Sequence, residues 1–339
     1  MVRIVVDCFG GDNSPEANVD GALAALAAIE DLSIVLTGDS ELIGRCLEGK
    51  PSFDGRLEIV HAPQVIGCDE KPTDVVRLKR DSSMMKAIMM LRDRDDVDGM
   101  VSTGSTGALV TGALVRLGRL RGVIRPAFCP LLPTMKGGIV GICDSGANVD
   151  VDADMLRQFA IMASLYLEKA YDVVKPRTAL LNVGKEAEKG DDKRRKAYAM
   201  LTETECVNFV GNMESRDLLS GSYDVVVCDG FSGNVLTKAT EGTAIELLKK
   251  VKASIFSRSI YKFGALFQKR MFRDLKEFMN YQNYGGSVLL GTSKVVVKGH
   301  GSSDALAVRR CIEQAYRMQK NNLGPAIEAE IAKYAHYEE

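Results

Sequence analysis

The sequence predicts an α/β protein built on a mostly parallel β-sheet between layers of helices. Short runs rich in Val and Ile recur along the 339 residues, and each is followed by a segment with helical periodicity. Some runs, such as residues 224–229, are apolar almost without interruption, which is typical of strands that are covered on both faces. Since 46% of the residues are hydrophobic, the chain can bury a large core.

Ten strands are expected in chain order, and most of them end at Gly, Asp, Ser or Asn. They are residues 3–7, 32–38, 57–61, 98–102, 128–132, 139–144, 178–183, 207–211, 224–229 and 294–298. Residues 233–281 break the alternation because they carry no strand signal, and they predict two long helices with a soft break at 257–264. We expect this segment to project as a helical arm from a single domain of residues 1–339, since no linker or internal repeat divides the chain.

The composition narrows the class of protein. Lys and Arg number 44 against 45 for Asp and Glu, so the molecule has almost no net field to attract nucleic acid, and any charged partner must meet a local patch. No apolar run is long enough for a signal peptide or a membrane span. The eight cysteines are scattered without paired spacing, which indicates buried thiols in a reducing compartment. A cytoplasmic protein is expected.

Six polar loops follow the expected strands, at the sheet edge where open α/β sheets bind their ligands. They are residues 7–15, 102–108, 144–150, 182–190, 229–234 and 298–304. Gly and Asn also end strands simply because they tolerate positive φ angles, so each loop alone is weak evidence. Together they offer many donors to an oxyanion, with Lys189, Lys298 or Arg77 as counter-charge, and they predict phosphate or phosphoester binding.

The standard nucleotide and metal motifs are absent from the sequence. The first loop lacks the Gly-rich dinucleotide fingerprint and places Asp12 where a pyrophosphate would approach, and residues 184–186 do not form a P-loop. His61, His300 and His336 are far apart, and no His or Cys spacing resembles zinc ligation. Aspartates at strand ends more often cap helices than bind Mg²⁺. Neither a cofactor nor a metal is predicted.

A set of ordered motifs gives these loops a family resemblance. They are VDCFGGD at 6–12, STGSTGAL at 102–109, GANVD at 146–150, LNVG at 181–184 with Glu186, Lys189 and Gly190, CDGFSGNV at 228–235, YGG at 284–286 and GHGS at 299–302. In this order they resemble the bacterial phosphate acyltransferases of the PlsX family, from residue 3 to about residue 320. The chain departs from the family at Cys8, Phe9, Ser105 and Ser145. Because Ser105 still offers a hydroxyl, we expect this chain to keep the reaction of the family with an altered affinity for its substrate.

The resemblance implies a three-layer α/β/α Rossmann-like sandwich related to isocitrate and isopropylmalate dehydrogenases, and a homodimer. It also implies transfer of a long-chain acyl group from acyl carrier protein to inorganic phosphate. The acyl phosphate would pass to a membrane glycerol-phosphate acyltransferase for phospholipid synthesis. This chemistry requires no Ser-His-Asp nucleophile, because phosphate is already largely dianionic and a thiolate is a competent leaving group.

Positioning and charge stabilisation should therefore dominate catalysis. The candidate substrate-binding residues are Gly10, Gly11, Asp12, Arg77, Gly104, Ser105, Thr106 and Glu186. The candidate catalytic residues are Asn148, Lys189, Asn234 and His300. We expect Lys189 to bind phosphate, and Asn148, Asn234 and His300 to serve the oxyanion and the thiolate. His300 is the best candidate for proton delivery because its free pKa lies near ambient pH, although it could instead bond backbone carbonyls.

Three other functions fit parts of the sequence. A phosphotransacetylase-like enzyme would use the same phosphate loops but take an acyl group from coenzyme A. A hydroxyacid dehydrogenase on a related fold would need the glycine fingerprint that is missing here. A non-enzymatic scaffold at the membrane surface would explain the arm but leave six polar loops without a purpose.

Two surfaces are expected to meet partners. The basic cluster at 192–196 could dock the acidic carrier protein, although such runs are usually a solvated helix face. At the arm tip, Phe256, Ile260 and Phe263 stand beside Lys252, Arg258 and Lys262, the composition of an interfacial anchor. We therefore expect peripheral attachment to the inner face of the cell membrane. A second row of apolar residues at 267–278 could instead pack the two arm helices against each other or form a dimer contact.

Overall fold

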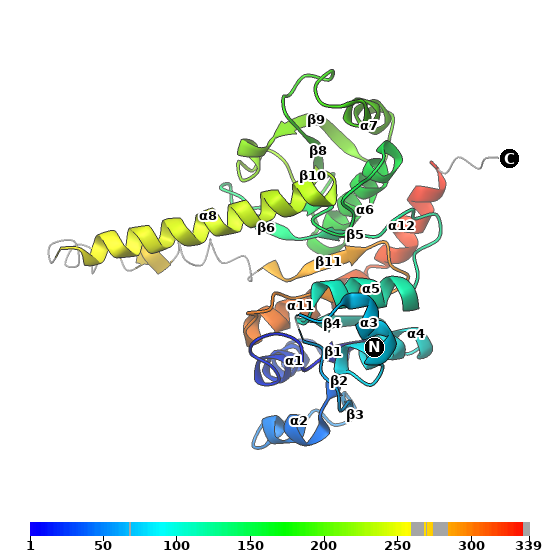
Figure 1. Ribbon diagram of the computed structural model, residues 1–339, viewed down its shortest axis with the longest axis vertical. Coiled ribbons are helices and arrows are strands. Elements are labelled where there is room, and N and C mark those ends of the chain that lie inside the picture. Colours follow the sequence, from blue (N-terminus) through cyan, green and yellow to red (C-terminus); the bar gives the residue numbers. More distant parts are fainter. Residues whose placement is uncertain (68, 259–267, 269, 274–283, 335–339) are drawn as a thin grey trace.

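Two β-sheets organise the protein, each at the centre of one lobe (Figure 1). The computed structural model describes residues 1–67, 69–258, 268, 270–273 and 284–334. The first sheet has the order β3-β2-β1-β4-β12-β11-β5 and is parallel except for β11, which is antiparallel to both neighbours. Its strands are β1 Val2–Asp7, β2 Leu32–Gly38, β3 Leu57–His61, β4 Gly99–Ser102, β5 Ala127–Cys129, β11 Ser287–Leu290 and β12 Val295–Lys298.

The second sheet has the order β6-β7-β10-β8-β9 and is parallel except for β6. Its strands are β6 Leu131–Pro133, β7 Ile139–Cys143, β8 Arg177–Asn182, β9 Asn208–Glu214 and β10 Val225–Val227. Val225, Val226 and Val227 are all fully buried, as the uninterrupted apolar run predicts for a strand covered on both faces.

Helices cover both faces of the first sheet. The N-terminal half contributes α1 Glu16–Ala28, α2 Ser40–Leu47, α3 Pro72–Leu78, α4 Ser83–Asp93 and α5 Thr106–Arg116. The remaining helices of the described chain, in either lobe, are α6 Ala153–Tyr171, α7 Asp192–Thr202, α8 Gly230–Phe256, α11 Ala305–Lys320, α12 Leu323–Ala332 and the short 3₁₀ turn Ser215–Asp217. Helices α1 and α11 share a core with Ile4 and Val6 of β1, whereas α4 and α5 share another with Val5. The alternate faces of one strand thus meet two helical layers, which confirms the predicted α/β class.

All ten expected strands are present, with two differences. The run at 128–132 divides at Pro130 into β5 and β6, which belong to different sheets. Proline has no N–H to donate to a ladder, so the chain can leave one sheet there and enter the other. Strand β11 was not predicted. It is only four residues long and stands between Gly286 and Gly291, and glycines of this kind indicate a loop in the sequence.

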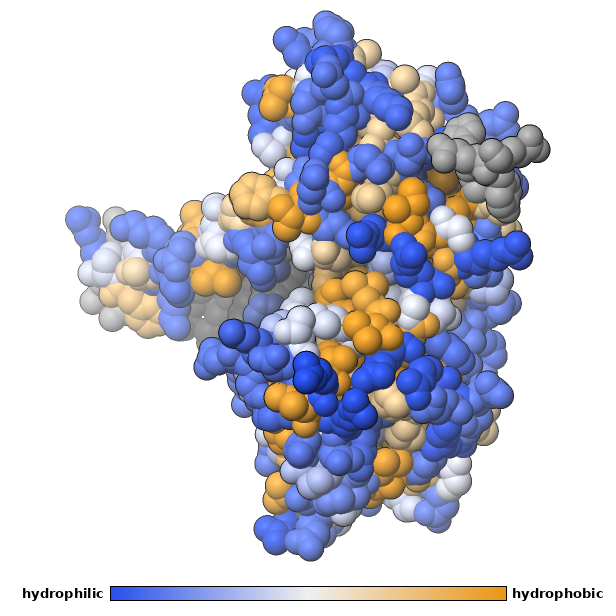
Figure 2. All heavy atoms as spheres, turned by 45° about the vertical axis from the view of Figure 1, so that its right-hand side comes forward, coloured by the Kyte–Doolittle hydropathy of each residue, from blue (hydrophilic) through white to orange (hydrophobic). Residues whose placement is uncertain are grey.

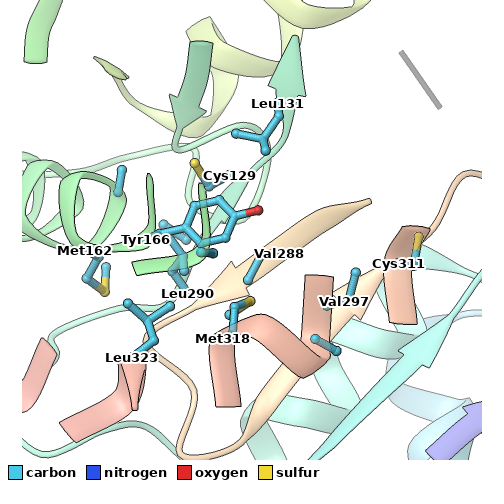
Figure 3. Close-up of a cluster of buried hydrophobic side chains, with 14 of the residues drawn as sticks. Cys129, Leu131, Met162, Tyr166, Val288, Leu290, Val297, Cys311, Met318 and Leu323 are labelled. Carbon is cyan, nitrogen blue, oxygen red and sulfur yellow. The ribbon is translucent and has the colours of Figure 1, made fainter. Parts of the chain in front are cut away.

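One hydrophobic core runs through the waist between the lobes (Figure 3). Tyr166 of α6 lies among side chains from both sheets and from α11, and Gln314 donates a hydrogen bond to its hydroxyl. The other labelled side chains are Cys129, Leu131, Met162, Val288, Leu290, Val297, Cys311, Met318 and Leu323. The same buried cluster therefore includes residues of both lobes, so the lobes share apolar packing.

Helix α8 projects from the waist away from both sheets (Figure 1). Its 27 residues form the first helix of the expected arm. Most of the second expected helix, together with Ile260 and Phe263 at the tip, lies outside the described residues. Among the helices that the structure describes, none is long and apolar enough to span a bilayer. Figure 2 shows hydrophilic residues over most of one face, apolar residues gathered near its middle, and both kinds on the projecting arm.

Candidate active site

A cleft of about 230 Å³ lies between the lobes, at the carboxyl ends of β4 and β12. The described residues that line it are Thr106, Phe128, Pro130, Leu131, Leu132, Ser145, Asn234, Thr237, Lys238, Glu241, Gly285, Gly286, Ser287, Lys298, Gly299, His300, Gly301, Ser303 and Ala307. One wall is polar and consists of the β12–α11 loop and the first turn of α5. The apolar wall consists of Phe128 of β5, the connecting Pro130, and Leu131 and Leu132 of β6. The cleft therefore presents donors and apolar surface to the same ligand.

Three loops of the first sheet are bonded together beneath the polar wall. Asp12 donates its N–H to the Gly301 carbonyl at 2.7 Å, and Gly299 donates to the Ser102 carbonyl at 2.9 Å. Gly10 is buried against Gly104, where an added Cβ would lie 2.4 Å from the Gly104 nitrogen. Such a distance leaves no room for a side chain at residue 10, so Gly10 is needed for the two loops to approach each other. Of the expected phosphate residues in these loops, Thr106 lines the cleft and the others lie beneath or beside it.

Lys298 brings a buried positive charge to the polar wall. It is the last residue of β12, and only 9% of it is exposed. Its Nζ donates to the carbonyl of Thr103 at 3.3 Å and also to that of Gly299. These bonds hold the ammonium between the loops that follow β4 and β12, where an anion in the cleft would meet it.

His300 lies two residues further along the same wall. Its Nδ1 is 2.9 Å from the Ser302 hydroxyl and accepts the Ser302 N–H at 3.3 Å. Although part of the residue reaches solvent, burial in the cleft lowers the pKa of His300 below its ordinary value. The positive charge of Lys238 lowers this pKa further, Glu241 opposes that effect, and Lys298 adds a smaller decrease. The lowered pKa favours the neutral form of the ring.

Helix α8 contributes a further group of residues to the lining of the cleft. Asn234, Thr237, Lys238 and Glu241 recur at three and four positions, so they share one face of the helix. The Thr237 and Ser145 hydroxyls are 3.0 Å apart, and Lys238 forms a 2.8 Å ion pair with Glu241. Asn234 is exposed, so its amide can reach a ligand in the cleft.

Asn148 has a different position from the one expected for an oxyanion donor. Its Nδ2 donates to the Pro126 carbonyl at 2.8 Å and to the Asp144 carboxylate at 2.9 Å. Both amide hydrogens are therefore used within the protein. Asp144 is fully buried, and burial raises the pKa of its carboxyl while these hydrogen bonds oppose the increase. We assign Asn148 to holding Asp144 in place.

Three other expected residues lie outside the lining of this cleft. Lys189 and Glu186 are exposed on the loop after β8, where Asn182 binds the Lys189 carbonyl and Asn212 binds that of Glu186. Arg77 is exposed on α3. The sequence analysis grouped these residues because the sequence does not show which of the two sheets each strand belongs to.

The basic cluster that begins α7 is largely paired within the protein. Arg194 binds Asp191 at 2.7 Å and the partly buried Asp229 at 2.8 Å. Lys193 binds Asp150 at 2.9 Å, and Arg195 binds Asp192. These carboxylates reduce the positive field that the cluster can offer to an acidic partner.

Several lining residues were not singled out from the sequence, namely Thr237, Lys238, Glu241 and Ser303. Their signal was present but weak. The three on α8 recur at helical spacing after the fifth polar loop, whereas Ser303 lies inside the sixth. Placing them required knowledge of which loops face each other across the waist.

The chain is similar to known proteins over almost its whole length. Residues 2–324 match the family described as fatty acid synthesis protein. A phosphate acyltransferase of Halalkalibacterium halodurans is 41% identical over 332 residues, which cover 98% of this chain and 97% of the relative. A phosphate acyltransferase of Bacillus subtilis is 40% identical, and the match covers 97% of this chain and 98% of the relative. A phosphate acyltransferase of Clostridioides difficile is 37% identical, and the match covers 98% of this chain and 97% of the relative.

Two solved structures share the fold at low sequence identity. A phosphotransacetylase from Streptococcus pyogenes superposes with a TM-score of 0.60 at 16% identity, covering 96% of this chain and 94% of that one. The EutD phosphotransacetylase from Staphylococcus aureus gives a TM-score of 0.59 at 15% identity, with 93% and 94% covered. These likenesses support the α/β architecture of two parallel-rich sheets.

Proposed function

This chain belongs to the phosphate acyltransferase family and transfers an acyl group to phosphate, and from that premise we propose that its donor is a long-chain thioester of acyl carrier protein. The observation that carries the proposal is the cleft with one polar and one apolar wall. Phosphate requires donors and positive charge, whereas the carbons next to the thioester require apolar contact. The family also excludes the dehydrogenase and scaffold functions considered above.

Phosphate binds to the polar wall in this proposal. The Lys298 ammonium and the Thr106 hydroxyl contact its oxygens, while Gly10, Gly11, Gly104 and Ser105 shape the loops that hold these two groups. Lys298 thus takes the role expected for Lys189. Charge-assisted hydrogen bonds of this kind are about twice as strong as neutral ones.

The acyl group lies against Phe128, Pro130, Leu131 and Leu132. A phosphate oxygen attacks the thioester carbon, the carbon–sulfur bond breaks, and the proton of the attacking hydrogen phosphate ends on the leaving sulfur. Asn234 and His300 donate to the carbonyl oxygen while it carries negative charge. Removing one such donor from an acyl-transfer enzyme slows it by roughly 100- to 1,000-fold.

The donor is tested by comparing acyl carrier protein and coenzyme A thioesters that carry the same palmitoyl group. Acyl phosphate is trapped with hydroxylamine and quantified at saturating phosphate. The proposal expects a higher kcat/KM for the carrier protein, because a protein donor adds contacts outside the cleft. Equal or better turnover of the coenzyme A thioester would assign the chain to phosphotransacetylase-like chemistry.

The enzyme works as a homodimer attached to the inner face of the cell membrane in this proposal, and it passes its amphiphilic product to a membrane glycerol-phosphate acyltransferase. Phe256 at the end of α8 is 60% exposed, and Lys252 precedes it by one turn. Each cation near an anionic leaflet contributes about 1 kcal/mol. Such a tip would hold the protein reversibly without a membrane span.

Flotation with anionic phosphatidylglycerol vesicles tests the attachment. Changing Ile260 and Phe263 together to Asp should abolish flotation and preserve turnover of a soluble short-chain donor. A matched control changes Val174, an equally apolar residue that is 85% exposed beyond α6, to Asp. If the tip variant floats as well as the Val174 variant, the tip is not the anchor.

A further inference from the structure

The loop between β12 and α11 determines which nitrogen of His300 carries the proton. The Ser302 backbone N–H points at Nδ1 at 3.3 Å, and a backbone N–H can only donate. Nδ1 must therefore be an acceptor, so the single proton of the neutral ring is on Nε2. The Ser302 hydroxyl, 2.9 Å from the same nitrogen, then donates as well.

The charges around the ring favour the same neutral form. Lys238 from α8 and Lys298 from β12 oppose an imidazolium, whereas Glu241 from α8 and Asp12 from the β1–α1 loop favour it. Together with burial, the two lysines prevail and lower the pKa of His300. An imidazolium would also turn Nδ1–H toward the Ser302 N–H, so that two donors would face each other.

We propose that Ser302 is a positioning residue that fixes His300 as a neutral Nε2–H donor to the thioester oxygen, so that His300 stabilises the oxyanion without giving up its proton. This inference rests on the proposed acyl transfer in the cleft. It differs from the proton delivery that the sequence suggested for His300. The proton that reaches the leaving thiolate comes from the attacking hydrogen phosphate, so the imidazole enters and leaves the reaction unchanged.

Amide side chains provide a direct test, because glutamine can place an N–H near the position of Nε2 and cannot exchange protons at neutral pH. His300→Gln should keep acyl phosphate formation within about tenfold of the wild-type rate, whereas His300→Ala should lose about 100-fold or more. His300→Asn places its donor near Nδ1 and serves as the matched control, with a loss close to that of alanine. A glutamine variant as inactive as the alanine variant would overturn the proposal.

The role of Ser302 is tested with Ser302→Ala in the wild type and in the His300→Gln variant. Ser302→Ala should lower kcat by about three- to tenfold in the wild type, the range expected for one lost hydrogen bond, with the KM for phosphate unchanged. In the His300→Gln background the same change should have no effect, since the amide lacks the Nδ1 to which the Ser302 hydroxyl donates. An equal loss in both backgrounds would mean that Ser302 acts only through the fold of the loop.

The pH profile gives an independent readout. A neutral donor predicts a wild-type kcat that is constant from pH 8 down past 6.5 and falls only below the lowered pKa of His300. A general acid of that pKa would lose rate steadily as the pH rises above it. Wild-type protein that forms no acyl phosphate at all would refute the proposed function, whereas an active wild type with a falling alkaline limb would refute this inference alone.

Discussion

Asp144 connects the two lobes through hydrogen bonds, so its replacement has an effect that can be worked out. Oδ1 accepts the Phe128 N–H at 2.9 Å from β5 of the first sheet. Oδ2 accepts the Asn148 N–H at 2.6 Å and the Asn148 Nδ2 at 2.9 Å, while the Ala147 N–H lies 3.1 Å from both oxygens. Four donors therefore converge on one buried carboxylate.

In Asp144→Asn, the amide should place its oxygen where Oδ2 was, because three of the four donors point there. Only the Phe128 N–H then loses its acceptor, which costs about 1 to 3 kcal/mol. Removing a buried charge offsets part of this loss. Asp144→Ala leaves all four donors without their acceptor, so we expect a fall in the free energy of unfolding of about 4 kcal/mol, at least twice that of the asparagine variant.

Urea denaturation followed by circular dichroism measures both values. The control is Asp150→Ala, since the Asp150 side chain is 95% exposed and its ion pair with Lys193 should contribute less than about 1 kcal/mol. If Asp144→Ala were as stable as this control, or if Asp144→Asn were less stable than Asp144→Ala, the stabilising role proposed for the four hydrogen bonds to Asp144 would be wrong.

Two further predictions concern the polar wall. Gly10→Ala would bring a methyl group 2.4 Å from the Gly104 nitrogen and separate the two loops, so we expect kcat/KM to fall about 100-fold. The control is Gly44→Ala in α2, which should keep full activity because the added methyl group would meet nothing within 4 Å beyond the adjacent backbone of its own helix. Lys298→Met should remove the increase in Tm that wild-type protein shows with added phosphate, because the variant lacks the buried ammonium. The control is Lys249→Met, which changes an exposed lysine. If Lys298→Met showed the same phosphate-induced increase in Tm as the wild type, the proposed phosphate site would be wrong.

The fold could be predicted well because its signals are local. Each parallel strand is a buried apolar run that the sequence displays directly, as at Val225–Val227. Strand β11 was missed because antiparallel pairing with β5 and β12 supplies its stability, and the pairing with β5 joins residues about 160 positions apart. The division at Pro130 was missed for a related reason, since a missing N–H does not reveal which sheet the chain enters next.

The candidate site could be predicted only in part because it depends on which loops face each other. His300, Asn234 and Thr106 lie in loops or helix turns that reach the cleft, and the sequence indicated them through their polar surroundings. Lys189 and Lys298 looked equivalent, since each follows a strand beside glycine. The order of strands separates them: β12 lies next to β4 in the first sheet, whereas β8 lies between β10 and β9 in the second.

Helix α8 links the proposed chemistry to the proposed attachment. Asn234 lines the cleft near its start and Phe256 ends it, and 22 residues at 1.5 Å each place them about 33 Å apart. An arm standing upright on a bilayer would hold the cleft at that distance from the lipid. At 100° per residue, however, the exposed apolar residues Phe231, Val235, Ile245 and Phe256 fall within an arc of about 80°, with Leu247 outside it. A stripe along the whole helix favours an arm that lies flat against an apolar surface, so a long acyl product leaving the cleft would meet that surface beside α8 without crossing water.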